Sequence, residues 1–198
     1  MDNWNLLETE IWTIARTEEG TAVLLKPAGI ELTVPVFIGE SEAQSILIGL
    51  GDVPVSRPLT HDLILEIIRK TGYSVDHIEI YDLKENTFLG RLALVRPGGS
   101  GFVFIDARPS DLIAVAVRCK CPSLVASHVV QEAGIPIQTV LEAINTAVKA
   151  AEKSSHEQNA LRQHSRRSSL LSELEAALAV ENYERAAEIR DILNLLGT

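Results

Sequence analysis

The chain has 198 residues, 46% of them hydrophobic, and its 27 acidic and 18 basic side chains give a formal net charge of −9. This apolar content excludes wholesale disorder, and no apolar run approaches the length of about 18 residues that spans a bilayer. The acidic balance disfavours tight, sequence-blind nucleic-acid binding, although carboxylates that hold a divalent metal can supply positive charge locally.

The first part of the chain predicts three strands and one helix. Residues 6–26 alternate between apolar and polar side chains on both sides of a glycine-containing turn, which indicates two strands. Residues 30–38 continue as a third strand, in which Pro35 favours an edge position or a bulge. A helix is expected over residues 40–48, because glycines follow it directly.

The middle of the chain predicts two helices and three strands. Thr60 is expected to be the N-cap of a helix with apolar residues along one face. Residues 75–83 and 87–95 read as a hairpin, and residues 102–106 as a further strand. Pro109 then suits the first turn of a helix whose following residues are apolar all round, so this helix should be buried.

These elements define the predicted fold class. Strands outnumber helices and run in hairpins, and residues 124–126 add a last short strand. We therefore expect a strand-rich α+β domain over residues 1–140 with about three helices. The order of strands, polar turn and helix occurs twice, which suggests an internal duplication.

The rest of the chain has a different character. Residues 141–168 are polar and predict a linker or a solvated helical extension. Residues 169–198 carry apolar side chains at helical spacing on both sides of a break at Glu181-Asn182, which indicates an antiparallel helical hairpin. Such a hairpin is too small to be stable alone, so its exposed face should dock on a protein.

Two polar clusters stand at predicted helix starts, where folds commonly place binding and catalytic groups. One cluster surrounds residues 57–62, and the other follows a predicted strand at residues 106–111. The candidate catalytic residues are Arg57, His61, Asp62, Asp106, Arg108 and Asp111.

These residue types suit metal-assisted cleavage of a phosphodiester. The reaction needs carboxylates that hold Mg²⁺ or Mn²⁺ and a cation that stabilises the developing negative charge. Arg57 or Arg108 would contact the phosphate, and His61 would transfer protons near neutral pH. The expected cofactor is a divalent metal, and no organic cofactor is expected. The candidate metal ligands are Glu42, Asp62, Asp106 and Asp111.

The same residues have a structural alternative. A carboxylate near a helix N-terminus is stabilised by the helix dipole. Asp106 and Asp111 flank Arg108, so the three would form ion pairs, and Arg57 with Asp62 would do the same. The clusters would otherwise pair across the molecule. The sequence leaves the site and the scaffold interpretations open.

The C-terminal hairpin resembles the UVR motif of the excision-repair proteins UvrB and UvrC. The resemblance is carried by Leu170, Leu174 and Leu178 and by the run from Ala179 to Asp191. It implies contact between proteins through paired helical hairpins, and it does not imply catalysis.

The preceding domain, from about Leu6 to Gly134, resembles the bifunctional nuclease family. Its motifs are Pro-Val-Phe-Ile-Gly at 35–39 followed by Glu42, Arg-Pro-Leu-Thr-His-Asp-Leu at 57–63, and Ile-Asp-Ala-Arg-Pro-Ser-Asp at 105–111. Members are described as cleaving both RNA and DNA. One departure is Ser56, which stands where many members have proline.

Two functions follow as expectations. The first is a divalent-metal-dependent nuclease that acts on RNA or DNA and carries a protein-binding hairpin. The second is a non-enzymatic regulatory or adaptor protein that oligomerises and recruits a repair or proteolysis partner through residues 169–198.

The surroundings of the protein can also be predicted. Unpaired strand edges in an apolar domain favour a homodimer, and no membrane partner is expected. The first residues lack signal-peptide features, and Cys119 and Cys121 stand too close for an ordinary structural disulfide, so we expect a cytoplasmic protein.

Overall fold

The computed structural model describes residues 5–17, 20–99 and 101–179, with 182, 184–185, 188 and 190–192 beyond them. The chain divides into two compact units, residues 1–140 and 141–198. Each unit is described by itself. None of the helices formed by the described residues is long and apolar enough to cross a membrane.

The first unit begins with an antiparallel meander and a helix. Strands β1 (Leu6–Thr17), β2 (Gly20–Pro27) and β3 (Leu32–Ile38) pair in sequence order, and β1 carries a bulge between Ile11 and Thr13. On its outer side, β3 pairs with β8 only at Leu32 and Thr33. Pro35 lies beyond these two residues, so its missing N–H costs no hydrogen bond to β8. Helix α1 (Glu40–Leu50) follows directly.

The same order then recurs. After helix α2 (Thr60–Lys70) come β4 (Ser74–Lys84), β5 (Thr87–Val95) and β6 (Val103–Ala107), again an antiparallel meander. Glu85 and Asn86 join β4 to β5 with φ values of 49° and 60°, as a tight hairpin turn requires. Helix α3 (Pro109–Cys119) follows β6 just as α1 follows β3.

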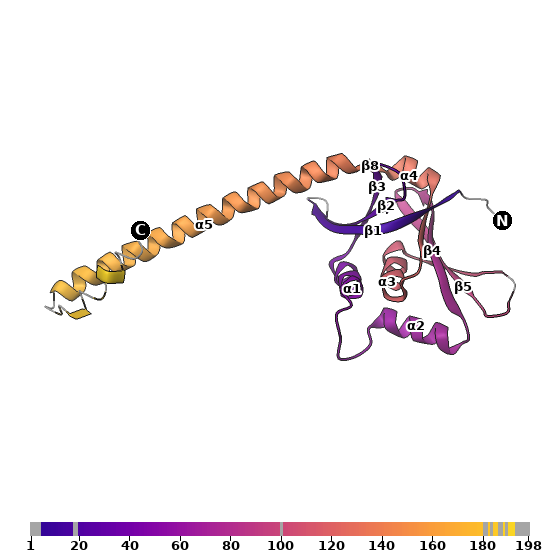
Figure 1. Cartoon of the computed structure of the whole chain (residues 1–198), viewed down its shortest axis with the longest axis horizontal. Helices are drawn as coiled ribbons and strands as arrows, with labels where there is room; N and C mark the ends of the chain where they lie inside the picture. Colours follow the sequence, from indigo (N-terminus) through magenta and orange to yellow (C-terminus); the bar gives the residue numbers. More distant parts are fainter. Residues whose placement is uncertain are drawn as a thin grey trace. The chain divides into compact units, whose positions relative to one another are not determined.

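Three short elements complete this unit and join its halves. Strand β7 (Ser123–Ala126) runs parallel to β4 and antiparallel to β1, so the eight strands form one sheet in the order β6-β5-β4-β7-β1-β2-β3-β8 (Figure 1). Helix α4 (Ser127–Ala133) and strand β8 (Ile135–Pro136) were not predicted from the sequence, because each is too short to show a period.

The core lies between the sheet and α3. Every α3 residue from Leu112 to Val117 is buried, as its uniformly apolar sequence predicts, against sheet residues such as Ile80 and Leu92. Two glycines allow this close approach. A Cβ added to Gly90 of β5 or to Gly49 of α1 would lie 2.5 Å from a side-chain carbon of α3. Figure 1 shows α1, α2 and α3 grouped beside the sheet.

One long helix leads into the second unit. Helix α5 runs unbroken from Ile137 to Ala179, so the predicted linker at 141–168 and the first helix of the predicted hairpin belong to one helix. Residues 184–185, 188 and 190–192 are helical again, and Arg185 approaches Glu173 at 4.0 Å, as in an antiparallel hairpin. The remaining residues of the predicted second hairpin helix lie outside the described part.

Candidate functional site

Three helices begin with the same chemical pattern. The third residue of each is acidic: Glu42 in α1, Asp62 in α2 and Asp111 in α3. A carboxylate in this turn is stabilised by the partial positive charge of the helix N-terminus. In α2, Asp62 Oδ2 accepts a 2.8 Å hydrogen bond from the Leu59 N–H. Leu59 is therefore the N-cap, and the predicted cap Thr60 is the first helical residue.

Arg108 joins the starts of α1 and α3. Its guanidinium donates to both carboxylate oxygens of Asp111, at 2.8 and 3.1 Å, and approaches Glu42 Oε1 at 3.5 Å. The Arg108 side chain is 67% exposed, so solvent reaches this cluster. A Cβ at position 39 would meet only the end of the flexible Glu42 side chain, which can move aside. We call Glu42, Arg108 and Asp111 the arginine cluster.

The charges of the arginine cluster stabilise one another. The hydrogen bond from Arg108 lowers the pKa of Asp111, and the same pair raises the pKa of Arg108. The Ser41 hydroxyl, 2.8 Å from Glu42 Oε2, lowers the pKa of Glu42, with a further contribution from Arg108. Both carboxyl groups are therefore ionised at neutral pH.

His61 connects α2 to the other two helices. Its Nδ1 atom lies 3.0 Å from the Ser45 hydroxyl of α1, and its Nε2 atom lies 3.5 Å from Asp111 Oδ1. The imidazole is only 13% exposed. Three helix starts that are distant in sequence thus meet around Asp111.

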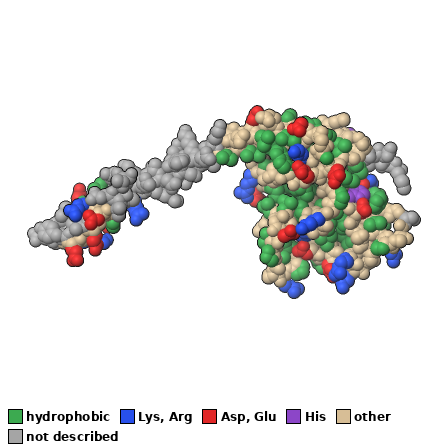
Figure 2. Space-filling view, in the orientation of Figure 1, with side chains coloured by type: hydrophobic (Ala, Val, Ile, Leu, Met, Phe, Trp, Pro, Cys, Tyr) green, Lys and Arg blue, Asp and Glu red, His purple; other side chains and the backbone are tan. Residues whose placement is uncertain are grey.

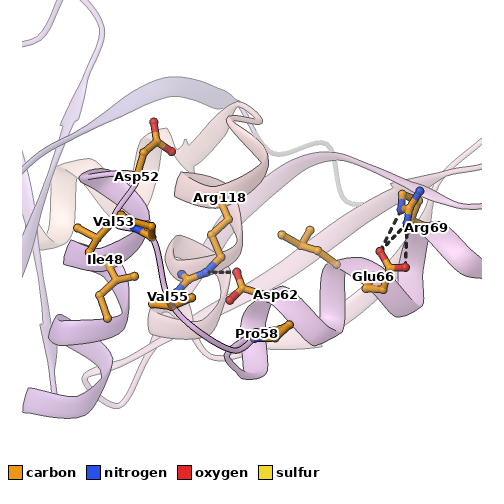
Figure 3. Close-up of a pocket in the computed structure, with 12 residues that line it drawn as sticks. Ile48, Asp52, Val53, Val55, Pro58, Asp62, Glu66, Arg69 and Arg118 are labelled. Atoms are coloured by element: carbon orange, nitrogen blue, oxygen red, sulfur yellow. Dashed lines mark hydrogen bonds and ion pairs between the residues drawn. The ribbon is translucent and has the colours of Figure 1, made fainter.

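Asp62 belongs to a second, more buried group. Arg118 of α3 donates from Nε to Asp62 Oδ1 at 2.9 Å (Figure 3). Its remaining nitrogens donate to the carbonyl of Ala114 at 2.7 Å and to the carbonyl and hydroxyl of Ser45 at 3.1 and 3.2 Å. Arg118 is 7% exposed and holds all three helices together. Its role cannot be predicted from the sequence, because a single arginine near the end of an apolar helix gives no signal.

Two hollows border these groups. The arginine-cluster groove has a volume of about 440 Å³, and its walls include Gly39, Glu42, Asn86, Asp106, Arg108 and Ser110. The second hollow measures about 570 Å³ and lies beside Asp62 and Arg118, under the loop with Val53, Val55 and Pro58 (Figure 3). Among the predicted site residues, Asp62 borders the second hollow, and Glu42, Asp106 and Arg108 border the groove.

Two predicted residues do not join the arginine cluster through their side chains. In the register of the sheet, Asp106 of β6 lies opposite Arg91 of β5, and Arg91 lies opposite Glu79 of β4. Directly paired residues share a face of the sheet, so Asp106 points away from α3 although it borders the groove. Arg57 is exposed, and it makes no hydrogen bond or ion pair within the described part of the chain.

The sheet carries a charged network that was not among the predicted site residues. His77 Nε2 lies 2.8 Å from Glu79 Oε1, Glu79 also pairs with Arg91, and Glu79 is 4% exposed. The Arg91 guanidinium stacks 3.9 Å from the ring centroid of Phe104. The signal was the alternation of His77, Glu79 and Tyr81 along one strand, which puts all three on one face.

The carboxylates that the sequence suggested as metal ligands are dispersed. Within the described ranges, no three His, Cys, Asp or Glu side chains gather closely enough to hold a metal ion. Glu42 and Asp111 face the same guanidinium, whereas Asp62 pairs with Arg118. The arginine cluster therefore offers two carboxylate donors at an exposed position.

Comparison with known proteins gives matches to both parts of the chain. Residues 23–138 match the model of the bifunctional nuclease domain, and residues 165–197 match the UvrB/uvrC motif. An uncharacterized protein of Mycobacterium tuberculosis is 36% identical over 141 residues, which cover 70% of this chain and 82% of that protein.

Plant proteins with an activity in their names are also similar. Bifunctional nuclease 1 of Arabidopsis thaliana is 27% identical over 187 residues, which are 91% of this chain and 54% of that protein. Bifunctional nuclease 2 of Oryza sativa subsp. japonica is 30% identical over 108 residues, 54% of this chain and 33% of that protein. The chain thus spans about half or less of these named relatives.

Proposed function

Because this chain belongs to the bifunctional nuclease domain family, we propose that it hydrolyses phosphodiester bonds in RNA, DNA or both. The observation that carries the proposal is the arginine cluster, in which an exposed guanidinium stands where helices α1, α2 and α3 begin. Helix N-termini attract anions, and a planar guanidinium matches the geometry of a phosphate.

The surface charge supports local rather than long-range attraction of a substrate. Figure 2 shows Lys and Arg side chains interspersed with Asp and Glu on one face of the first unit, without a continuous basic strip among the described residues. A nucleic acid would therefore be held at the groove itself. Arg108 would contact the phosphate, and His61 would position Asp111 through its Nε2 atom.

The donor set of the arginine cluster fits a hard divalent cation. Mg²⁺ is commonly bound by one or two carboxylates together with substrate phosphates and water, and Glu42 and Asp111 supply two ionised carboxylates. We propose these two residues as the ligands of Mg²⁺ or Mn²⁺. When bound, the ion would stabilise negative charge on the phosphate and lower the pKa of a bound water. Asp62 and Asp106 are left out, because one binds Arg118 and the other faces away from α3.

The test is cleavage of single-stranded RNA and DNA oligonucleotides with Mg²⁺ or Mn²⁺, and with EDTA. We expect wild-type activity that EDTA abolishes, and a loss on the order of 100-fold or more in the Glu42→Gln, Asp111→Asn double variant. Glu66→Gln is the matched control, since Glu66 forms an exposed ion pair with Arg69 on α2. Undiminished cleavage by a folded double variant would exclude the arginine cluster as the site.

The second unit supports an adaptor role beside the proposed activity. A UVR motif implies helical pairing with another protein, and described residues such as Leu171 and Ile192 expose apolar side chains there. We propose that residues 169–198 recruit a protein partner of the repair or proteolysis machinery.

A chain that ends at residue 168 should separate the two roles. We expect it to keep the hydrolytic rate of the full chain, because the arginine cluster lies within residues 1–140, and to lose the captured partner. The measurement combines the oligonucleotide assay with pull-down by the tagged full and shortened chains and mass spectrometry. Capture of the same proteins by both chains would contradict the role of the hairpin, whatever the outcome for cleavage.

A further inference from the structure

Strand β6 forms an unusual edge of the sheet. It is the terminal strand, and its first three residues and the residue before them are apolar and 43–49% exposed: Phe102, Val103, Phe104 and Ile105. The opposite edge is β8, which has two residues, one of them Pro136. Short strands, prolines and charges are the usual means by which proteins block an edge. The segment 101–105 has none of these protections.

The side chains around β6 are already ordered by contacts. On the outer face of β4, β5 and β6, which we define by His77, Glu79, Arg91 and Phe104, the Arg91 guanidinium lies over the Phe104 ring. Phe102 lies 5.9 Å from Phe104 and meets His77 edge-on at 5.4 Å between ring centroids. Side chains held in place before association lose less entropy on binding.

We propose that β6 pairs antiparallel with β6 of a second copy of this chain, about a two-fold axis at Ile105. The two sheets then become one continuous sheet. Paired residues share a face of the sheet. A two-fold axis normal to the sheet must therefore lie midway between the two copies of one residue, so that this residue pairs with itself. An isologous contact of this kind closes at two copies and leaves no free edge at β6.

Charge complementarity selects the second copy and this register. With Ile105 on the axis, Phe104 lies opposite Asp106 of the partner subunit. Arg91 already stacks over Phe104, so it comes close to the carboxylate of the partner's Asp106. Each contact occurs twice.

A nucleic acid is a less suitable occupant of the same surface. Exposed aromatic rings can stack on bases, but binding of a nucleic acid strand also requires net positive charge for its phosphates. On the outer face, Arg91 and His77 are already paired with Glu79, while Asp76 and Asp106 add negative charge. A phosphate backbone would meet this negative charge, whereas the pairing of two copies places each Asp106 near a guanidinium, Arg91 of the partner subunit.

The proposed pairing stands independently of the nuclease activity, but it would place two arginine clusters on one assembly. Arg108 is three residues from the axis residue, or about 10 Å along an extended strand. The two grooves would lie on either side of the axis and would be related by it.

The experiment compares the full chain with its Phe104→Asp and Phe37→Asp variants by size-exclusion chromatography with light scattering. Phe37 is 49% exposed on β3 and serves as the matched control. We expect a dimer for the wild type and for Phe37→Asp, and a monomer for Phe104→Asp with an unchanged circular dichroism spectrum. A monomeric wild type, or a dimeric Phe104→Asp, would overturn the proposal.

The register has its own test, made in a background with Cys119→Ser and Cys121→Ser. Ile105→Cys should form an intermolecular disulfide on mild oxidation, because residue 105 faces its own copy, and Phe37→Cys should not. Equal cross-linking of both variants would contradict the register. If the Phe104→Asp variant instead has the same mass in solution as the wild type but binds a fluorescent single-stranded RNA more weakly, the outer face binds nucleic acid and the proposed dimer is contradicted.

Discussion

Replacing Arg118 by alanine is expected to lower the free energy of unfolding by about 3 kcal/mol. Arg118 is buried, and it donates to the Asp62 carboxylate, to two backbone carbonyls and to the Ser45 hydroxyl. Its removal leaves a partly buried carboxylate and two carbonyls without their donor. Urea unfolding followed by circular dichroism would measure the change.

A matched variant separates burial from charge. Arg69→Ala removes an arginine from an ion pair on α2 in which Arg69 is 72% exposed, and exposed pairs contribute at most about 1 kcal/mol. Arg118→Lys should restore only part of the stability, since an ammonium group cannot reproduce the divergent donors of a guanidinium. Equal losses for Arg118→Ala and Arg69→Ala would contradict the structural role that we give to Arg118.

Arg108→Ala should have the opposite profile, with a large loss of activity and little change in stability. If the proposed function is correct, cleavage should fall roughly 100-fold to 1000-fold, because the cation that faces the phosphate is removed. The Arg108 side chain is two-thirds exposed, so its ion pairs contribute little to folding. Initial rates on a single-stranded RNA substrate and a urea titration would measure both effects.

Arg57→Ala provides the comparison for Arg108→Ala. Arg57 belongs to the other sequence motif, is exposed, and has no hydrogen bond or ion pair in the described part of the chain. Its loss should leave cleavage within about threefold of wild type, an allowance typical of surface substitutions. If Arg57→Ala reduced cleavage as strongly as Arg108→Ala, the proposed site would have to extend to the loop before α2.

Much of the fold follows from local sequence patterns. The alternating strands, the hairpin at Glu85-Asn86 and the buried helix after Pro109 are all predicted from side-chain period and turn chemistry, and the structure has them. The C-terminal helices were also predicted, and of the two alternatives for residues 141–168, a linker or a helical extension, the structure has the helix. The polar segment has no helix-breaking residue, so the helix continues through it.

The candidate site was only partly accessible to such reasoning. Asp106 and Asp111 are close in sequence, yet strand parity turns Asp106 to the outer face while Asp111 begins the helix on the inner face. Arg118 and His77 were overlooked for a related reason. The role of each residue depends on a partner from a distant segment. Arg118 binds Asp62, and His77 is linked through Glu79 to Arg91.

The position of β7 has a consequence for how the chain folds. Each meander consists of neighbouring strands, so its contacts form with little loss of chain entropy. Within the sheet, the four residues of β7 join the two meanders, and their pairing with β1 connects the first strand to a segment more than a hundred residues later. Closing that loop is the entropically expensive event, so β7 docking belongs late on the folding pathway. The two halves would be structured before they become one sheet.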